Sequence, residues 1–205
     1  MQAGVAAARA RHPDLGLQLN FLVMRPTASL EALEDAWEFA LRHDMTFHTD
    51  LIHYSLPYFV QGRDGELQFR AEDRPMVERV VARLLELKQA HPRRIPESEV
   101  SLRSIPDWLF QGPAMRIPCD VYKMLWIGAD WSVKLCYVTF DLGNLHEHRL
   151  SEILNSPVHQ QAARDAFQLR CPTCHCERDA RVRRDLASRI RYSRLGDDAS
   201  RQSAS

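Results

Sequence analysis

Three cysteines within six residues are the feature that most constrains this chain. Cys171, Cys174 and Cys176 lie in one Cys-Pro-Thr-Cys-His-Cys run, and Cys119 and Cys136 lie upstream of it. All five cysteines of the 205-residue protein therefore fall after residue 118. In a reducing compartment, clustered thiols bind metal more often than they form disulfides. The sequence predicts a metal centre in its second half.

The N-terminal residues and the charge balance predict a cytoplasmic globular protein. The chain begins without the basic and then apolar segment of a secretory signal peptide. No apolar run approaches the roughly 18 residues that a membrane-spanning helix needs. Lys plus Arg equals Asp plus Glu, at 27 each, so no net charge attracts nucleic acid or lipid. We expect no membrane contact and no nucleic-acid partner.

Residues 1–92 have the pattern of an α/β unit. An Ala-rich helix is predicted over Gln2–Arg11, with strands over Leu17–Met24 and Met45–Tyr54. Between the strands, Ser29 is predicted to cap a helix. Its apolar stripe consists of Leu30, Leu33, Trp37, Ala40 and Leu41. Because such a unit normally forms a parallel pair inside a larger sheet, we expect the end of an α/β barrel whose other half lies elsewhere in cis or in trans.

A packing helix and a proline-rich connection follow. Asp73 and Pro75 are predicted to begin the helix, whose apolar stripe consists of Met76, Val77, Val80, Val81, Leu84 and Leu85. Residues 93–118 contain four prolines and a short helical segment over Ser101–Phe110, as is typical of a connection between domains. We place the boundary near residue 112.

Residues 119–180 are predicted to form a small α+β domain. Two strands, Lys123–Gly128 and Ser132–Val138, read as a β-hairpin with Cys136 on its second strand. A helix from Pro157 to about Leu169 then leads into the clustered cysteines. Two distant thiols and one compact group can therefore converge on a single centre.

Residues 181–205 are predicted to form a basic helix and a disordered tail. From Glu177 onward the chain has eight arginines against five acidic residues. A basic helical surface of this kind is usually only solvated.

Cysteine spacing leaves three possibilities for the centre: iron-sulfur, zinc or no metal. Structural zinc ribbons draw ligands from two Cys-x-x-Cys knuckles, and this chain has only one. A thioredoxin-like pair at Cys171 and Cys174 should follow a strand, whereas here it follows a helix. An iron-sulfur cluster needs four thiolates and tolerates irregular spacing, which five cysteines can satisfy.

The second half of the chain resembles the C-terminal SPASM or twitch domain of radical SAM enzymes. The resemblance rests on the cysteine hairpin, on Leu142-Gly143-Asn144-Leu145-His146-Glu147, on Leu150-Ser151-Glu152-Ile153-Leu154-Asn155-Ser156, on Arg164 and on Cys171-Pro172-Thr173-Cys174. The strand at Asn20-Phe21-Leu22-Val23-Met24 and its following helix resemble the last units of the radical SAM partial barrel. In all, the resemblance covers about residues 15 to 180.

The resemblance implies an auxiliary [4Fe-4S] cluster. Its ligands would be Cys119, Cys136 and two of the three clustered cysteines, with Cys171 and Cys174 favoured by motif position. The cluster would lie beside aromatic side chains such as Trp126 and Tyr137, and would pass an electron or help to position a peptide or small-molecule substrate. An electron donor protein is a further expected partner.

The chain departs from the family pattern in three respects. Trp131 stands where the hairpin normally has a glycine, five residues before Cys136. Five cysteines suit one cluster, as in the twitch form, better than two. The Cys-x-x-x-Cys-x-x-Cys motif that binds the catalytic [4Fe-4S] cluster and S-adenosylmethionine does not occur in the sequence. We therefore expect those two cofactors only in an intact enzyme, and no S-adenosylmethionine cleavage by this chain alone.

Several polar residues have a structural and a functional interpretation. His48 and Asp50 should share one face of their strand, with His53 on the other. Structural roles are expected for these three, and surface positions for His146 and His148. His175, between two thiols, and Asn20, on the first strand, are lesser candidates for a ligand and a cofactor contact. The competing hypothesis for the whole chain is a non-catalytic zinc module whose basic helix binds a partner.

Overall fold

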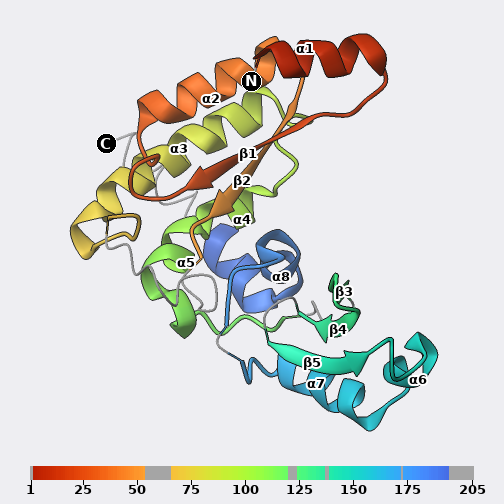
Figure 1. Ribbon diagram of the computed structural model, residues 1–205. Helices are drawn as coiled ribbons and strands as arrows, with labels where there is room; N and C mark the ends of the chain where they lie inside the picture. Colours follow the sequence, from red (N-terminus) through yellow and green to blue (C-terminus); the bar gives the residue numbers. More distant parts are fainter. Residues whose placement is uncertain (1, 54–65, 120–123, 137–138, 172, 194–205) are drawn as a thin grey trace. The chain divides into compact units, whose positions relative to one another are not determined.

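The computed structural model describes residues 2–53, 66–119, 124–136, 139–171 and 173–193 (Figure 1). Predictions for Tyr54, Tyr137 and the tail from residue 194 lie outside these residues. The chain divides into two compact units, which we describe separately. Unit 1 is Met1–Ile52 with Asp64–Phe110, and unit 2 is His53–Arg63 with Gln111–Ser205.

Unit 1 contains the predicted strand, helix and strand. Helix α1 (Gln2–Arg11) precedes β1 (Gln18–Val23), and α2 (Leu30–Arg42) connects β1 to β2 (Thr46–Leu51). The two strands pair in parallel, with Gln18 opposite Thr46 and Val23 opposite Leu51. Helix α2 packs against both strands (Figure 1). The predicted mixed α/β character and the parallel pair are confirmed.

Helix α2 begins where the sequence predicts but buries a narrower stripe. The Ser29 hydroxyl accepts a hydrogen bond from the Ala32 backbone N–H at 3.1 Å, which satisfies one of the free donors of the first turn. The buried residues are Leu33, Trp37 and Ala40, whereas Leu30 and Leu41 of the predicted stripe are exposed. Leu30 occupies the first helical position and Leu41 lies about 100° around the axis from Ala40, so neither faces the sheet.

The two faces of the parallel pair differ in polarity. One face is buried, and Phe21 stacks on Phe47 there with ring centroids 5.8 Å apart. The other face carries Asn20 and Leu22 opposite His48 and Asp50, and these residues are exposed or half-buried. Strand alternation explains the difference, and His48 and Asp50 share a face as predicted.

The remaining helices of unit 1 follow the proline-rich pattern. A 3₁₀ turn, η1 (Ala71–Asp73), leads into α3 (Arg74–Ala90), which buries Val77, Val80, Val81, Leu84 and Leu87. Two short helices, α4 (Glu99–Arg103) and α5 (Ile105–Gln111), stand in place of the single predicted helix. The break falls at Ser104, whose hydroxyl donates to the Ser101 carbonyl at 2.6 Å and so competes with the helical backbone.

Unit 2 begins with η2 (Gly112–Ala114) and contains a three-stranded antiparallel sheet. Its strands are β3 (Leu125–Ile127), β4 (Ser132–Leu135) and β5 (Phe140–Asn144), in the order β3-β4-β5. The predicted hairpin is present with shorter strands, and β5 was not predicted. Gly143 and Asn144 at its end are residue types that are rare in strands, so the sequence predicts a loop there.

Three labelled helices complete unit 2. Helix α6 (Leu150–Leu154) precedes α7 (Pro157–Phe167), whose N-cap Ser156 accepts from the His159 N–H at 3.1 Å. The sheet and these helices enclose one apolar core, formed by Val133, Leu135, Leu142, Ile153, Ala162 and Ala166. Helix α8 (Arg178–Arg184) follows the clustered cysteines, and residues 186–193 are helical as well, as predicted for the basic segment. Among the described residues, every helix is too short or too polar to span a bilayer.

Replacing Leu33 tests the packing of α2. Leu33 is fully buried and Leu30, one turn earlier, is 44% exposed. Leu33→Ala should lower the free energy of unfolding by about 2–5 kcal/mol, since it removes buried methyl groups and leaves a cavity. The matched Leu30→Ala variant should lose less than about 1 kcal/mol. Urea unfolding followed by circular dichroism measures both, and equal losses would contradict the assigned orientation of α2.

Candidate metal centre

Thiols from separate segments of unit 2 gather around one apolar side chain. Cys119, which is 8% exposed, packs with Leu169, and Cys136 and Cys176 pack against this pair. Cys174 is hydrogen-bonded to Cys176. The fifth thiol, Cys171, is half-buried and does not belong to this group in the described part of the chain. We call Cys119, Cys136, Cys174 and Cys176 the thiol group.

Secondary structure explains how the thiol group forms. Cys136 follows the last residue of β4, and Cys119 precedes the sheet. Cys174 and Cys176 lie in the short connection between α7 and α8. The sequence predicted that α7 would lead into the clustered cysteines and that the two distant thiols would approach them.

A hydrogen bond between Cys174 and Cys176 shifts the pKa values of the two thiols in opposite directions. The Cys176 thiol donates to the Cys174 sulfur, which lowers the pKa of Cys174 to about 6 although burial opposes the shift. The Cys176 backbone N–H and the charge of Arg181 lower it further. The same bond, then burial, then the charges of Cys174, Cys136 and Cys119 raise the pKa of Cys176. The surroundings of Cys174 therefore favour its thiolate, the form that binds metals.

Left-handed backbone conformations gather at the same place. Of the six non-glycine residues with positive φ in the described chain, four are Cys136 (φ 55°), Leu169 (57°), Thr173 (60°) and Glu177 (55°). Such conformations cost about 1–2 kcal/mol each and concentrate at functional sites. The backbone is thus held in a strained shape where the thiols meet.

A buried arginine holds the thiol-bearing segments together. Arg181, on α8, is 2% exposed. Its Nη1 donates to the carbonyl oxygens of Cys174 at 2.6 Å and Cys176 at 3.4 Å. Its Nη2 donates to the carbonyl oxygen of Ile117 at 2.6 Å, two residues before Cys119.

Sequence reasoning missed this role, because the arginine-rich segment reads as a solvated surface. Arg178 and Arg181 are in fact buried together with Val182. The available signal was the i, i+3, i+4 spacing of these three residues around one aliphatic side chain.

Comparison with known families agrees with this geometry. Residues 119–177 match the SPASM family, an iron-sulfur cluster-binding domain. The matched SPASM segment contains all five cysteines and ends directly before α8. Searches of curated proteins and of solved structures found no match to the chain.

The SPASM segment carries donors of the kind that bind an iron-sulfur group, namely the thiols of the thiol group. In the described residues, no three His, Cys, Asp or Glu side chains form a group that could hold a metal ion, so the type of donor rather than a preformed geometry carries this assignment. The buried Oγ1 of Thr173 also has no hydrogen-bond partner among the described residues, and hydrogen bonds to sulfur are a usual feature of cluster sites. The donor chemistry therefore fits an iron-sulfur group.

Gly143 and Asn144 of the SPASM segment stabilise the turn of the hairpin. Gly143 has φ +133°, a conformation that side-chain-bearing residues rarely adopt. The Asn144 side chain donates to the Asp130 carbonyl at 2.9 Å and accepts from the His146 N–H at 2.8 Å. These two residues tie the β3-β4 turn to the segment after β5.

Trp131 keeps the backbone that a glycine would give. Its φ is +63°, in the left-handed region. Its N–H donates to the Gly128 carbonyl at 3.0 Å, and its carbonyl accepts from Leu145 at 3.0 Å. The turn of the SPASM segment thus retains a left-handed residue at this place despite the large side chain.

The aromatic and histidine predictions have mixed outcomes. Trp126 is 44% exposed, and its position beside a cluster stays a prediction. Two of the three residues of its strand are exposed. His146 and His148 are exposed, as predicted. His175 is 4% exposed, and its ring centroid lies 4.3 Å from that of His53.

The polar residues of unit 1 have structural partners. The buried Glu97 carboxylate accepts from the Thr49 N–H at 2.7 Å and from its hydroxyl at 3.3 Å. His48 Nδ1 lies 3.8 Å from the same carboxylate. These contacts join β2 to the segment before α4, which agrees with a structural role.

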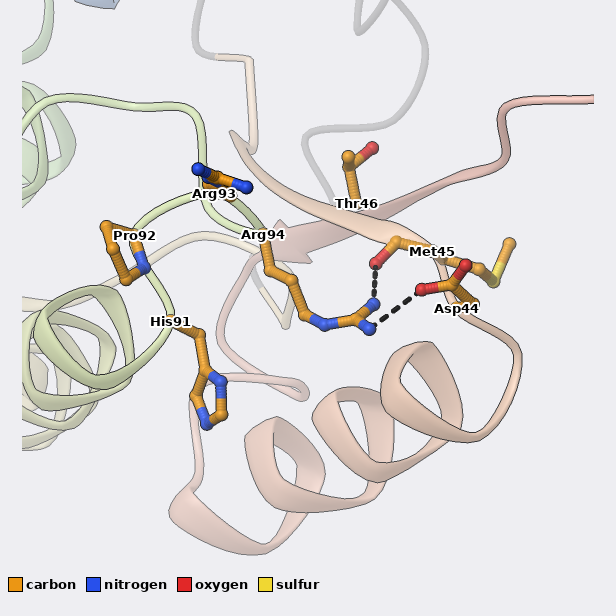
Figure 2. A pocket seen from close by; sticks show the side chains of 7 residues that line it. All are labelled: Asp44, Met45, Thr46, His91, Pro92, Arg93 and Arg94. Atoms are coloured by element: carbon orange, nitrogen blue, oxygen red, sulfur yellow. Dashed lines mark hydrogen bonds and ion pairs between the residues drawn. The ribbon is translucent and has the colours of Figure 1, made fainter.

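Unit 1 has a pocket at the amino end of strand β2. It measures about 480 Å³ and is lined by Asp44, Met45, Thr46, His91, Pro92, Arg93 and Arg94 (Figure 2). Arg94 crosses it, donating to the Met45 carbonyl at 3.1 Å and to Asp44 at 2.7 Å. Because the pocket is at the start of β2, and ligands of α/β folds bind at the carboxyl ends of strands, we assign it a structural role.

The strain at Trp131 can be measured by substitution. Trp131→Val should lower the free energy of unfolding by about 1–2 kcal/mol relative to Trp131→Gly, because a β-branched residue tolerates positive φ poorly. Both variants lose the same ring contact with His146, 5.9 Å between centroids, so the comparison isolates the backbone. Urea unfolding measures the difference, and equal stabilities would contradict a left-handed turn.

Proposed function

We propose that the chain binds an auxiliary [4Fe-4S] cluster through the thiol group and forms the C-terminal part of a radical SAM enzyme. The observation that carries the first statement is that Cys119, Cys136 and Cys176 pack around Leu169, with Cys174 hydrogen-bonded to Cys176, inside a segment that matches an iron-sulfur cluster-binding family. Four thiolates are the usual ligand set of such a cluster.

The ligand set follows packing rather than motif position. Motif position favours Cys171 with Cys174, whereas Cys176 is the thiol that packs against Cys119 and is hydrogen-bonded to Cys174. We therefore propose Cys119, Cys136, Cys174 and Cys176 as ligands, with Cys171 beside the centre.

The proposed ligand set limits the chemistry. A bound cluster would supply one-electron transfer. Since four thiolates leave no iron with an open position, direct binding of a substrate to the metal is disfavoured. The chain's own residues bury the thiols and fix their separation, which influences the potential of the centre. Electron transfer or positioning of a neighbouring substrate is the role that this arrangement supports.

Unit 1 supports the wider enzyme context. Its parallel pair has one buried face and one polar face, as the strands of a (β/α) barrel have, and the polar face carries Asn20, His48 and Asp50. We propose that the rest of the barrel, with S-adenosylmethionine and a second [4Fe-4S] cluster, comes from another part of a longer chain or from a partner chain. The substrate would be a peptide or a small metabolite. An upstream reading frame encoding Cys-x-x-x-Cys-x-x-Cys would support this, and one encoding an unrelated domain would count against it.

The zinc module is the weaker alternative. Its basic surface remains available in part, since Arg183, Arg184, Arg189 and Arg191 are exposed although α8 buries Arg178 and Arg181. The thiol group, however, lacks the second Cys-x-x-Cys knuckle of a zinc ribbon.

Metal analysis tests the cluster directly. After anaerobic purification and reconstitution with iron and sulfide, the wild-type protein should be brown and contain about four irons per chain. Cys119→Ser should lose most of this iron, because it removes a ligand from the centre of the thiol group. Colourless wild-type protein with about one zinc would contradict the proposal and favour the structural module.

A comparison of two neighbouring cysteines tests the ligand set. Cys176→Ser should lose the cluster, whereas Cys171→Ser should keep nearly the wild-type content of iron and sulfide. Both substitutions change one half-buried thiol in the same connection, so each serves as the control for the other. Loss in Cys171→Ser with retention in Cys176→Ser would assign the ligands by motif position instead.

A further inference from the structure

We propose that Arg181 is a positioning residue for the cluster, and that its charge raises the reduction potential of the centre. This inference rests on the proposed cluster. It concerns a residue on α8, beyond the matched segment 119–177.

The hydrogen bonds of Arg181 connect the two sides of the centre. One guanidinium nitrogen donates to Cys174 and Cys176, and the other donates to Ile117, 64 residues away along the chain. Ile117 fixes the approach to Cys119, and the other carbonyls belong to two proposed ligands. A rigid planar group with donors on both sides therefore sets the separation between these segments.

The location of the charge determines its electrical effect. Arg181 is 2% exposed, so its positive charge lies inside unit 2. A [4Fe-4S]²⁺ core with four thiolates carries a net charge of about −2, and reduction adds one more negative charge. A fixed cation at the backbone of two ligands stabilises the reduced form more than the oxidised form, because Coulomb energy grows with charge. Little solvent intervenes to screen it.

The rest of α8 is built to hold Arg181 in place. Val182 is fully buried, and the left-handed Glu177 turns the chain sharply from Cys176 into the helix. Arg183, by contrast, is exposed and pairs with Asp179 at 3.4 Å across one turn. Arg183 is therefore a matched control: the same residue type on the same helix, two positions away.

The test compares Arg181→Gln, Arg181→Lys and Arg183→Gln with the wild-type chain, all reconstituted anaerobically. Iron and sulfide content, circular dichroism of the iron-free protein and the midpoint potential from a dithionite titration followed by electron paramagnetic resonance are measured. In Arg181→Gln, the equilibrium constant for one-electron reduction should fall about tenfold, which corresponds to 59 mV. Arg181→Lys keeps the charge and should stay within about threefold, and Arg183→Gln should match the wild type.

Each outcome decides between alternatives. If Arg181→Gln folds without iron but loses the cluster, while Arg181→Lys retains it, the proposal also stands. Unchanged iron content and potential in Arg181→Gln would overturn it. Unfolding of both Arg181 variants without iron would overturn it too, since the role would then be general stability. If the wild-type chain itself binds no cluster, the proposed function fails, and the failure is distinct from those above.

Discussion

The structure of unit 2 depends on one constraint: thiols from distant segments must lie close together, although contacts between thiols contribute little stability by themselves. Thiolates at one site repel, and the pKa of Cys176 is raised by its hydrogen bond to Cys174, by burial and then by the charges of the other three thiols. The protein compensates with burial against Leu169 and with backbone held in left-handed conformations. Arg181 adds a fixed positive charge and three hydrogen bonds to carbonyls. A bound metal group would remove the protons that now reduce the repulsion.

Local patterns were enough to predict most of the elements. The serine cap at Ser29, the helix start at Pro157 and apolar periodicity predicted α2 and α7, and both occur. The strand-helix-strand order predicted the parallel pair, which also occurs. The predictions of secondary structure and burial were wrong where a tertiary contact determines the outcome. β5 contains Gly143 and Asn144, residues that disfavour strands, and pairing with β4 overrides that preference. Leu30 and Leu41 fit a helical stripe, yet only their position relative to the sheet determines their burial.

The candidate site was predictable in composition but not in detail. Cysteine count and spacing indicated a metal centre in the second half, and the family match agrees for residues 119–177. Spacing could not choose between Cys171 and Cys176, because a connection of a few residues can turn either thiol inward. The left-handed φ of Thr173 and Glu177 sets the path of this connection, and both are ordinary residues in sequence. The role of Arg181 was not predicted, because an arginine-rich segment is expected to be exposed. Only the carbonyl groups that accept its hydrogen bonds explain its burial.

The two units pose different electrostatic problems, and their solutions indicate different roles. In unit 1, the buried carboxylate of Glu97 is satisfied by a backbone N–H and a hydroxyl from Thr49, which are neutral donors that fix a strand. In unit 2, the buried cation of Arg181 is directed at carbonyls of cysteine residues, where a negative centre would gain most from it. A purely structural arginine could be replaced by a neutral residue that keeps its hydrogen bonds to the carbonyls, whereas a counter-charge must remain a cation. Because Arg181 lies outside the matched family segment, its proposed role would extend the functional unit of this chain to α8.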